Sequence, residues 1–141
     1  MKKLKIFLLI IGVIAVLGAI IFLIDYNNVE YTINLFKLEE IASITIDTLS
    51  QYDNKKEFKD EEETIKEIYD VLADKKTNID SINDVPVNPD ILYLVKFKNN
   101  TENSKSAYIY KKDNQYYIEQ PYNGIYQITE KEYAIIEKFI K

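Results

Sequence analysis

The sequence ILYLVKFKNNTENSKSAYIYKKDNQYYIEQ, residues 91–120, decides the fold of this chain. It contains three segments rich in β-branched and aromatic residues: 91–98, 107–111 and 115–120. Polar linkers join them at 99–104 and 112–114. In the first segment every second residue is apolar, which places on one face Ile91, Tyr93, Val95 and Phe97. This period of two predicts strands, and the short linkers predict that neighbouring strands run antiparallel.

A further strand is predicted upstream of this stretch, in residues 41–49 (IASITIDTL). Its polar and apolar residues alternate, which is the pattern of a half-buried strand. The apolar positions are Ala42, Ile44 and Ile46. The segment 51–59 that follows is polar and is predicted to be a connection without a strand.

A hairpin is predicted downstream of residue 120. Pro121 favours an edge or a turn because it has no amide hydrogen for a sheet. Asn123-Gly124 is the dipeptide that best accommodates two positive φ angles, so the tight turn is placed there. Residues 125–128 then return as a short edge strand.

The first predicted helix begins at Asp60, with three acidic residues in its first turn, where the helix dipole favours negative charge. Its apolar stripe has the spacing i, i+3, i+4 and i+7, formed by Ile65, Ile68, Tyr69 and Leu72. Lys75 and Lys76 are expected at its C-terminal end, again the favoured sign.

The last predicted helix begins at Thr129, which forms a capping box with Glu132. Its apolar face comprises Tyr133, Ile136, Phe139 and Ile140. The predicted order is therefore β-α-β-β-β-(β)-α. The fold class is α+β, with a small and mainly antiparallel sheet and two helices on one of its faces.

Residues 6–24, IFLLIIGVIAVLGAIIFLI, predict a transmembrane helix, because 19 apolar residues nearly match the ~30 Å hydrocarbon core of a bilayer. Lysines at positions 2, 3 and 5 precede it, while Asp25 and Glu30 follow it. The positive-inside rule then predicts a single-pass protein of the cell membrane with a cytoplasmic N-terminus and an extracellular C-terminal domain. A cleaved signal peptide is the alternative, but the run is longer than the usual ~7–15-residue apolar region.

Three parts follow from this anchor: the Lys-rich start and anchor at 1–25, a connector at 26–37, and the extracytoplasmic domain at 38–141. The connector fits either a continuing helix or an extended tether. A signal-anchor that is retained rather than cleaved is the prediction for the first part.

The composition argues against enzymatic function. The 141 residues include no Cys, His or Trp, and all 18 basic residues are lysines. No thiolate, imidazole or guanidinium is therefore available for catalysis, metal binding or phosphate binding, and we expect no catalytic, cofactor-binding or metal-binding residue. Beyond Asp25 the chain has 15 lysines and 22 acidic residues, a net charge of −7. This charge disfavours nucleic acid and favours a basic peptide or protein as partner.

Two segments are candidates for an interaction surface. The first is a loop rich in hydrogen-bonding side chains that contains Thr77, Ser81, Asp84 and Pro86. The second is the predicted hairpin turn, with Pro121, Tyr122, Gly124 and Tyr126. The alternatives are structural: local turns for the first segment, and a closing hairpin with tyrosine rings on the sheet edge for the second. Three further tyrosines are predicted to share the outer sheet face: Tyr108, Tyr110 and Tyr117.

Three stretches carry a resemblance to a known family: IASITI at 41–46, Thr77 with SINDVP at 81–86, and YIEQPYNGIY at 117–126. In these, residues 38–141 resemble an uncharacterised family of small membrane-anchored proteins of low-GC Gram-positive bacteria, a domain of unknown function. The resemblance implies an extracytoplasmic α+β domain. It implies no established activity, cofactor or partner, and it transfers no catalytic residue.

The leading functional hypothesis is a membrane-anchored, non-enzymatic interaction domain that contacts a protein or peptide through the two candidate segments. A second hypothesis is immunity-like protection against a cationic peptide. A small extracytoplasmic enzyme ranks last, because a pair of carboxylates chosen from 22 acidic residues has no diagnostic spacing.

Overall fold

An apolar helix, α1 (Lys2–Asn27), forms most of the first of two units, Met1–Glu30. The computed structural model describes residues 2–27, 29–49 and 54–141. Within α1, the segment Ile6–Asp25 is long and apolar enough to cross a membrane, and none of it is buried against protein.

The second unit, Tyr31–Lys141, is an α+β domain, as the sequence predicts. It begins with a short strand inside the segment assigned to the connector. Its elements are β1 (Tyr31–Thr32), the 3-10 turn η1 (Leu38–Glu40), β2 (Ile41–Thr48), β3 (Asn54–Lys59), α2 (Glu62–Leu72), β4 (Lys76–Thr77), β5 (Ile91–Asn99), β6 (Ser104–Lys112), β7 (Gln115–Gln120), β8 (Gly124–Ile128) and α3 (Glu130–Ile140). Six strands form one sheet in the order β3-β2-β5-β6-β7-β8, with every neighbouring pair antiparallel, and β1 pairs with β4.

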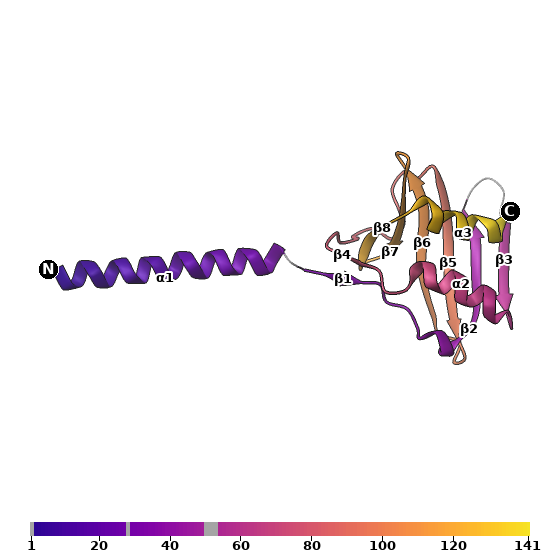
Figure 1. Ribbon diagram of the computed structural model, residues 1–141, viewed down its shortest axis with the longest axis horizontal. Helices are drawn as coiled ribbons and strands as arrows, with labels where there is room; N and C mark the ends of the chain where they lie inside the picture. Colours follow the sequence, from indigo (N-terminus) through magenta and orange to yellow (C-terminus); the bar gives the residue numbers. More distant parts are fainter. Residues whose placement is uncertain (1, 28, 50–53) are drawn as a thin grey trace. The chain divides into compact units, whose positions relative to one another are not determined.

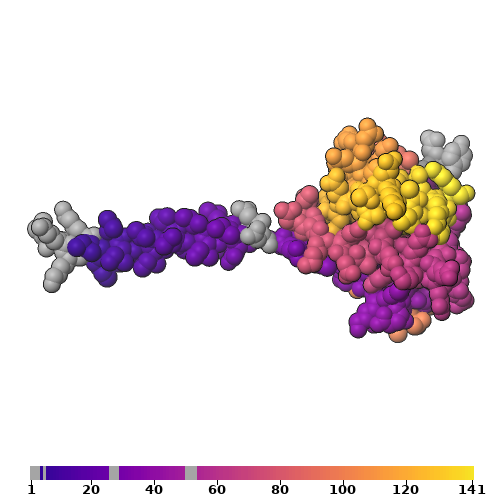
Figure 2. Space-filling view, in the orientation of Figure 1, coloured from indigo at the N-terminus to yellow at the C-terminus, as the bar shows by residue number. Residues whose placement is uncertain are grey.

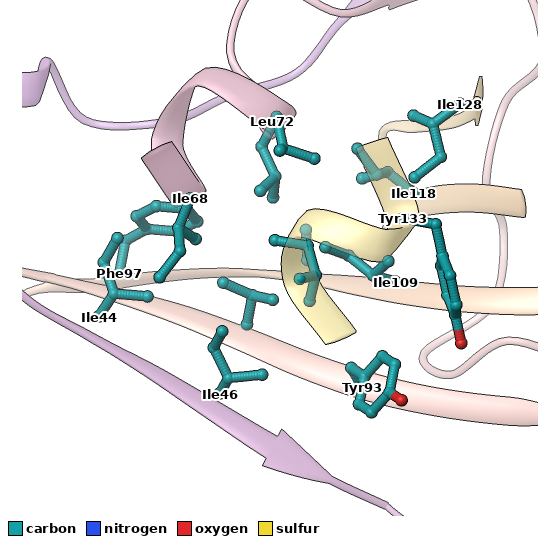
Figure 3. Packing of buried hydrophobic residues seen from close by; sticks show 14 of the residues in the cluster. Ile44, Ile46, Ile68, Leu72, Tyr93, Phe97, Ile109, Ile118, Ile128 and Tyr133 are labelled. Atoms are coloured by element: carbon teal, nitrogen blue, oxygen red, sulfur yellow. The ribbon is translucent and has the colours of Figure 1, made fainter. Parts of the chain in front are cut away.

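Both helices of the domain lie on one face of this sheet (Figure 1) and beside each other (Figure 2), which confirms the predicted layers. The strand register aligns the apolar residues of neighbouring strands: Tyr93, Ile109, Ile118 and Tyr126 form one row across β5 to β8. The apolar stripes of α2 and α3 pack on this face, where Ile68 and Leu72 of α2 are fully buried (Figure 3). Ile136 of α3 is fully buried as well. This inner face is therefore a continuous hydrophobic core.

The capping box at the start of α3 is confirmed. The Thr129 hydroxyl accepts a hydrogen bond from the Glu132 amide at 3.2 Å, and the Glu132 carboxylate accepts one from the Thr129 amide at 2.7 Å. The Glu132 carboxylate also pairs with Lys75. The local sequence pattern was enough to place this helix start because both partners lie within four residues.

The prediction that 51–59 is a polar connection is wrong for Asn54–Lys59, which forms β3 (residues 51–53 lie outside the described residues). β3 is an edge strand that pairs with β2, and Phe58 is its one buried side chain. The Phe58 ring meets Phe139 edge to face, with 5.6 Å between centroids. With a single buried position, NKKEFK shows no alternation, and its lysines are typical of a strand edge protected from further pairing.

The first helix of the domain is shorter at both ends than predicted. α2 begins at Glu62, because Asp60 has a left-handed φ of 60°. It ends at Leu72, so Lys75 and Lys76 lie beyond the helix rather than in its last turn, and Lys76 belongs to β4. The buried face of α2 also differs by one residue from the predicted apolar stripe. Val71 is buried, whereas Tyr69, which the stripe included, is half-buried.

The turn before β8 also differs from the prediction. The left-handed residue is Tyr122, with a φ of 57°, whereas Gly124 has no positive φ and is the first residue of β8. The pair of positive φ angles occurs instead in the β6–β7 linker, at Asp113 (50°) and Asn114 (60°). Asn and Asp tolerate this region better than most residues, so that linker forms the tight two-residue turn.

Candidate interaction surface

The sheet face opposite the helices carries, on β6 and β7, three tyrosines and the carboxylate of Glu119. The register places Tyr108 opposite Glu119 and Tyr110 opposite Tyr117, which confirms that the three tyrosines share the outer face. The rings of Tyr110 and Tyr117 stack, with 5.4 Å between centroids and 26° between planes. Since α2 and α3 both lie on the opposite face (Figure 1), another element covers the buried outer-face residues Tyr110 and Glu119.

That element is the segment from β4 to β5, residues 78–90, named here the 78–90 loop. Its first part runs along the free edge of β8: the Ile125 amide donates to the Ile79 carbonyl at 3.0 Å. The Ser81 amide donates to the Asn123 carbonyl at 3.4 Å, and Asp80 and Gly124 form an isolated antiparallel bridge. The two candidate segments of the sequence, 77–86 and 121–126, are thus brought side by side.

A buried carboxylate fixes the loop to the outer face. Glu119 is 2% exposed, and its two oxygens accept hydrogen bonds from the Ser81 hydroxyl at 2.6 Å and the Tyr110 hydroxyl at 3.1 Å. Burial and the nearby Glu119 carboxylate raise the pKa of Tyr110. A carboxylate this deeply buried is costly unless it is hydrogen-bonded, so the loop and Glu119 stabilise each other.

Further bonds hold the rest of the loop. The Tyr122 hydroxyl donates to the Asp84 carboxylate at 2.5 Å, and this bond, together with the Asp84 charge, raises the pKa of Tyr122. The Lys112 ammonium donates to the Val87 carbonyl at 3.0 Å, and the Asp90 amide donates to the carbonyl of residue 111 at 2.8 Å. The loop is therefore tied at its start, middle and end.

The segment that leads into the domain is tied to the same corner. Gln120 is 8% exposed; its side-chain oxygen accepts from the Asn34 amide at 2.7 Å and its nitrogen donates to the Asn34 carbonyl at 2.9 Å. Asn123 donates to the Thr32 carbonyl at 2.9 Å. Beside these bonds lies an open polar depression of about 630 Å³ that includes Lys105 and Pro121 in its lining. Sequence reasoning missed this corner, because its partners lie about 90 residues apart.

Three residues predicted to form the interaction surface, Gly124, Tyr126 and Thr77, have structural roles. Gly124 is buried, and a Cβ there would lie 2.8 Å from Cγ2 of Thr77 and 2.9 Å from the Tyr126 hydroxyl. Tyr126 is 1% exposed, and burial raises its pKa to about 12. The Thr77 hydroxyl accepts from the Ile79 amide at 3.1 Å, the local turn given as the alternative.

The other residues predicted to form the interaction surface differ in how exposed they are. Ser81 is 3% exposed, and Pro86 is also buried. Pro121 is partly exposed, while Asp84 and Tyr122 are exposed. Asp84 and Tyr122 are thus the two predicted residues that the structure both exposes and joins.

Besides its acidic residues, the loop presents aliphatic side chains to solvent. It exposes Ile82 (74%), Ile79, Val85 and Val87, and Ile91 is exposed directly after it. Sequence reasoning proposed none of them for the interaction surface, and it placed Ile91 on the apolar face of a strand. The available signal was the presence of four aliphatic residues in a segment that has neither a helical nor a strand period.

Within the described ranges, no group of three or more acidic, His or Cys side chains is placed to hold a metal ion. The Ser81 hydroxyl and the Glu119 carboxylate are the one close pair at this surface that invites a catalytic interpretation. Both are buried and directed at each other, so the arrangement positions the loop.

Comparison with known proteins gives a family and a fold. The DUF5301 family, described as "Domain of unknown function (DUF5300)", matches residues 29–127. The structure described as "NMR structure of the protein from Ruminococcus gnavus" is 31% identical over 72% of this chain and 98% of that chain, with a TM-score of 0.57. No curated protein matches. The match begins just after α1 and includes both candidate segments.

Proposed function

This chain belongs to the DUF5301 family, and we propose that it is a membrane-anchored, non-enzymatic interaction domain that presents the 78–90 loop to a polypeptide partner. In this proposal α1 is a retained single-pass anchor of the cell membrane. The lysine-rich N-terminus is cytoplasmic, and the domain that follows is extracellular. The length and apolar composition of Ile6–Asp25 support the anchor, and the lysines before it and the acidic residues after it support the orientation.

We extend the proposal to the bacterial source. A low-GC Gram-positive bacterium is supported by the composition, in which lysine supplies every basic residue and Trp and Cys are absent. The resemblance in IASITI and PYNGIY points the same way. An extracellular domain beyond a single membrane fits such a cell envelope.

The observation that carries the interaction function is the exposure of aliphatic side chains on a loop that is held in place. Ile82 and Val87 are 74% and 55% exposed, although the segment around them is bound to the sheet at several points. Exposed apolar clusters mark interaction sites in soluble domains. A loop that is ordered before binding loses little conformational entropy when a partner docks, which favours affinity.

The non-enzymatic part rests on the fate of the reactive groups. At this corner Ser81, Glu119 and Tyr126 could act as nucleophile or general base, and each is at most 3% exposed. A substrate would have to displace the loop to reach Ser81 and Glu119, and Tyr126 lies in the hydrophobic core on the inner face of the sheet. Asp84 and Tyr122 are exposed, and the hydrogen bond between them holds both at the surface as binding groups.

A site-specific crosslink tests the proposal. A photoreactive benzophenone residue is placed at Ile82 of the full-length chain in its own membranes, and at exposed Lys131 of α3 as the matched control. We expect one dominant polypeptide adduct from position 82 that is missing from position 131. Identical adducts from both positions, or adducts to lipid alone from position 82, would contradict the proposed function.

Labelling tests the topology. The chain has no cysteine, so Lys131→Cys introduces a unique thiol in the second unit. An impermeant maleimide added to intact cells should label this variant as fully as it does in lysed cells. Labelling only after lysis would place the domain in the cytoplasm and end the orientation part of the proposal.

A further inference from the structure

We propose that the partner of the 78–90 loop is a cationic amphipathic polypeptide segment. Its apolar side chains meet the exposed aliphatic residues of the loop, and a lysine or arginine side chain meets Asp84 and Tyr122. This inference rests on the proposed function and deepens it, because it names the chemistry of the partner at the same surface.

The first observation is a ready site for a cation. The Tyr122 hydroxyl donates to the Asp84 carboxylate, so an aromatic ring and a negative charge are held next to each other on the surface. Tyr122 is 70% exposed although its backbone has the strained φ of 57°. A carboxylate beside an open aromatic face attracts an ammonium or guanidinium through both charge and the ring quadrupole.

The second observation is that the aliphatic residues alternate with acids. Along the stretch 79–91, exposed Asp80, Asp84 and Asp90 are interspersed with the exposed aliphatic residues at positions 79, 82, 85, 87 and 91. Lys112, whose ammonium donates to the Val87 carbonyl, places one positive charge beside these three carboxylates. The surface is thus apolar with a negative rim, which is the complement of an amphipathic segment whose polar face is basic.

The size of the surface sets the length of the partner segment. Nine residues, 79–87, span at most about 30 Å when extended. A partner helix of that length has about five turns, each able to direct one apolar side chain at the loop. The domain as a whole supports the same sign, since the chain beyond Asp25 has a net charge of −7.

The acidic rim is also what disfavours a lipid surface as the occupant. Loops that enter a bilayer interface combine apolar side chains with lysine and arginine, which anionic lipids attract. Asp80, Asp84 and Asp90 would meet such lipids with repulsion. Insertion of the loop into lipid is accordingly an outcome that the test must be able to detect.

The test uses the absence of tryptophan from the chain. The Ile82→Trp variant of the full-length protein, in nanodiscs of zwitterionic phosphatidylcholine, carries a single indole on the loop. The probe is an 18-residue amphipathic helix of leucine and lysine. A helix with glutamate in place of lysine has the same apolar face and serves as the control peptide, and empty nanodiscs correct for partition of the peptide into lipid.

We expect the leucine–lysine helix to shift the indole emission to the blue with saturation, and the leucine–glutamate helix to leave it unchanged. Asp84→Asn keeps the oxygen that accepts from Tyr122 but removes the charge. It should raise the Kd about threefold to tenfold, as expected for a partly exposed ion pair. Tyr122→Asn, which tolerates the positive φ, should have a similar effect. Glu63→Gln, an exposed acid of α2, is the matched control and should leave the Kd unchanged.

Three results would overturn the inference. Equal binding of the glutamate helix would show that charge does not select the partner, while a polypeptide crosslink from Ile82 would still uphold the proposed function. An unchanged Kd in Asp84→Asn would remove the cation site. Quenching of the indole by brominated lipid without peptide would place the loop in the bilayer.

Discussion

The two faces of the sheet are covered by different means. On the inner face, two amphipathic helices bury rows of aliphatic and aromatic residues, and the contacts are mainly apolar (Figure 3). On the outer face, a loop without regular structure is held by hydrogen bonds to Glu119, Tyr122 and Lys112. From this difference we infer that the apolar burial on the inner face provides most of the stability of the domain. The outer face fixes the shape of one exposed loop, so its substitutions should be felt locally.

The largest effect is expected from the inner face. Phe97 is fully buried in the core, so Phe97→Ala should lower the free energy of unfolding by about 3–5 kcal/mol. Ile82→Ala removes apolar atoms from the 78–90 loop, where the side chain is 74% exposed, and should change it by less than about 0.5 kcal/mol. Urea denaturation of the wild type and of both variants measures the two changes in the free energy of unfolding. Similar losses in the two would mean that the loop is part of the core.

The second effect tests how the loop is attached. Glu119→Ala leaves the buried hydroxyls of Ser81 and Tyr110 without their acceptor and should lower the stability by about 2–3 kcal/mol. Hydrogen exchange should show lost protection in the 78–90 loop while the amides of β5 and β6 keep theirs. Glu57→Ala removes an exposed carboxylate from β3 and serves as the control. Uniform loss of protection across the sheet would contradict a local role.

The third effect concerns the edge at which the two faces meet. Gly124→Ala places a Cβ at 2.8 Å from Cγ2 of Thr77 and at 2.9 Å from the Tyr126 hydroxyl, and should cost about 1–2 kcal/mol. Thr77→Ser removes that methyl group, so the double variant should recover part of the loss. Melting temperatures of the single and double variants measure this. If the serine restores nothing, the contact with Thr77 is not the source of the strain.

The smallest effect comes from a hydroxyl on the inner face. The buried Tyr126 hydroxyl has no hydrogen-bond partner among the described residues, so Tyr126→Phe should change the stability at pH 7 by at most about 1 kcal/mol, in either direction. Its pKa of about 12 exceeds the ~10 of an unfolded tyrosine, so the folded state holds this proton more tightly. The stabilisation of the folded state that comes from this raised pKa is fully present below pH ~10. It is lost as the pH rises to about 12.

Urea denaturation at pH 7 and pH 11 checks this titration. The Tyr126→Phe variant should lose less stability than the wild type between the two pH values, because one raised tyrosine pKa has been removed. Equal losses in the two proteins would show that Tyr126 does not contribute to the alkaline decline.

Local patterns predicted the elements whose signals are contained in a few residues. The β-branched and aromatic residues of 115–120 predicted β7, and the capping box of Thr129 matches the start of α3. β3 was missed because Phe58 is its one buried residue. The end of α2 was predicted too late, at Lys75 and Lys76. Lysines are favoured near a helix C-terminus, but their presence does not show at which residue the helix ends.

For the candidate surface, the sequence located the two segments but not the use of their side chains. Asp84 and Tyr122 meet across 38 residues, and so do Ser81 and Glu119, yet the first pair is exposed and the second is buried. Residue type cannot distinguish these pairs, because both join a hydroxyl to a carboxylate. The exposed Ile82 is the opposite case, an apolar residue that composition alone would place inside.

The amino-acid sequence by itself determined the apolar N-terminal helix, the antiparallel α+β fold and the sheet face of the tyrosines in β6 and β7, because these depend on periodicity and local composition. Only the tertiary structure decided that the 78–90 loop crosses the outer face, that Glu119 is buried beneath it, and that four aliphatic side chains remain in solvent. Those outcomes depend on contacts between residues far apart in the chain. The free energy of such contacts depends on burial, which no local pattern specifies.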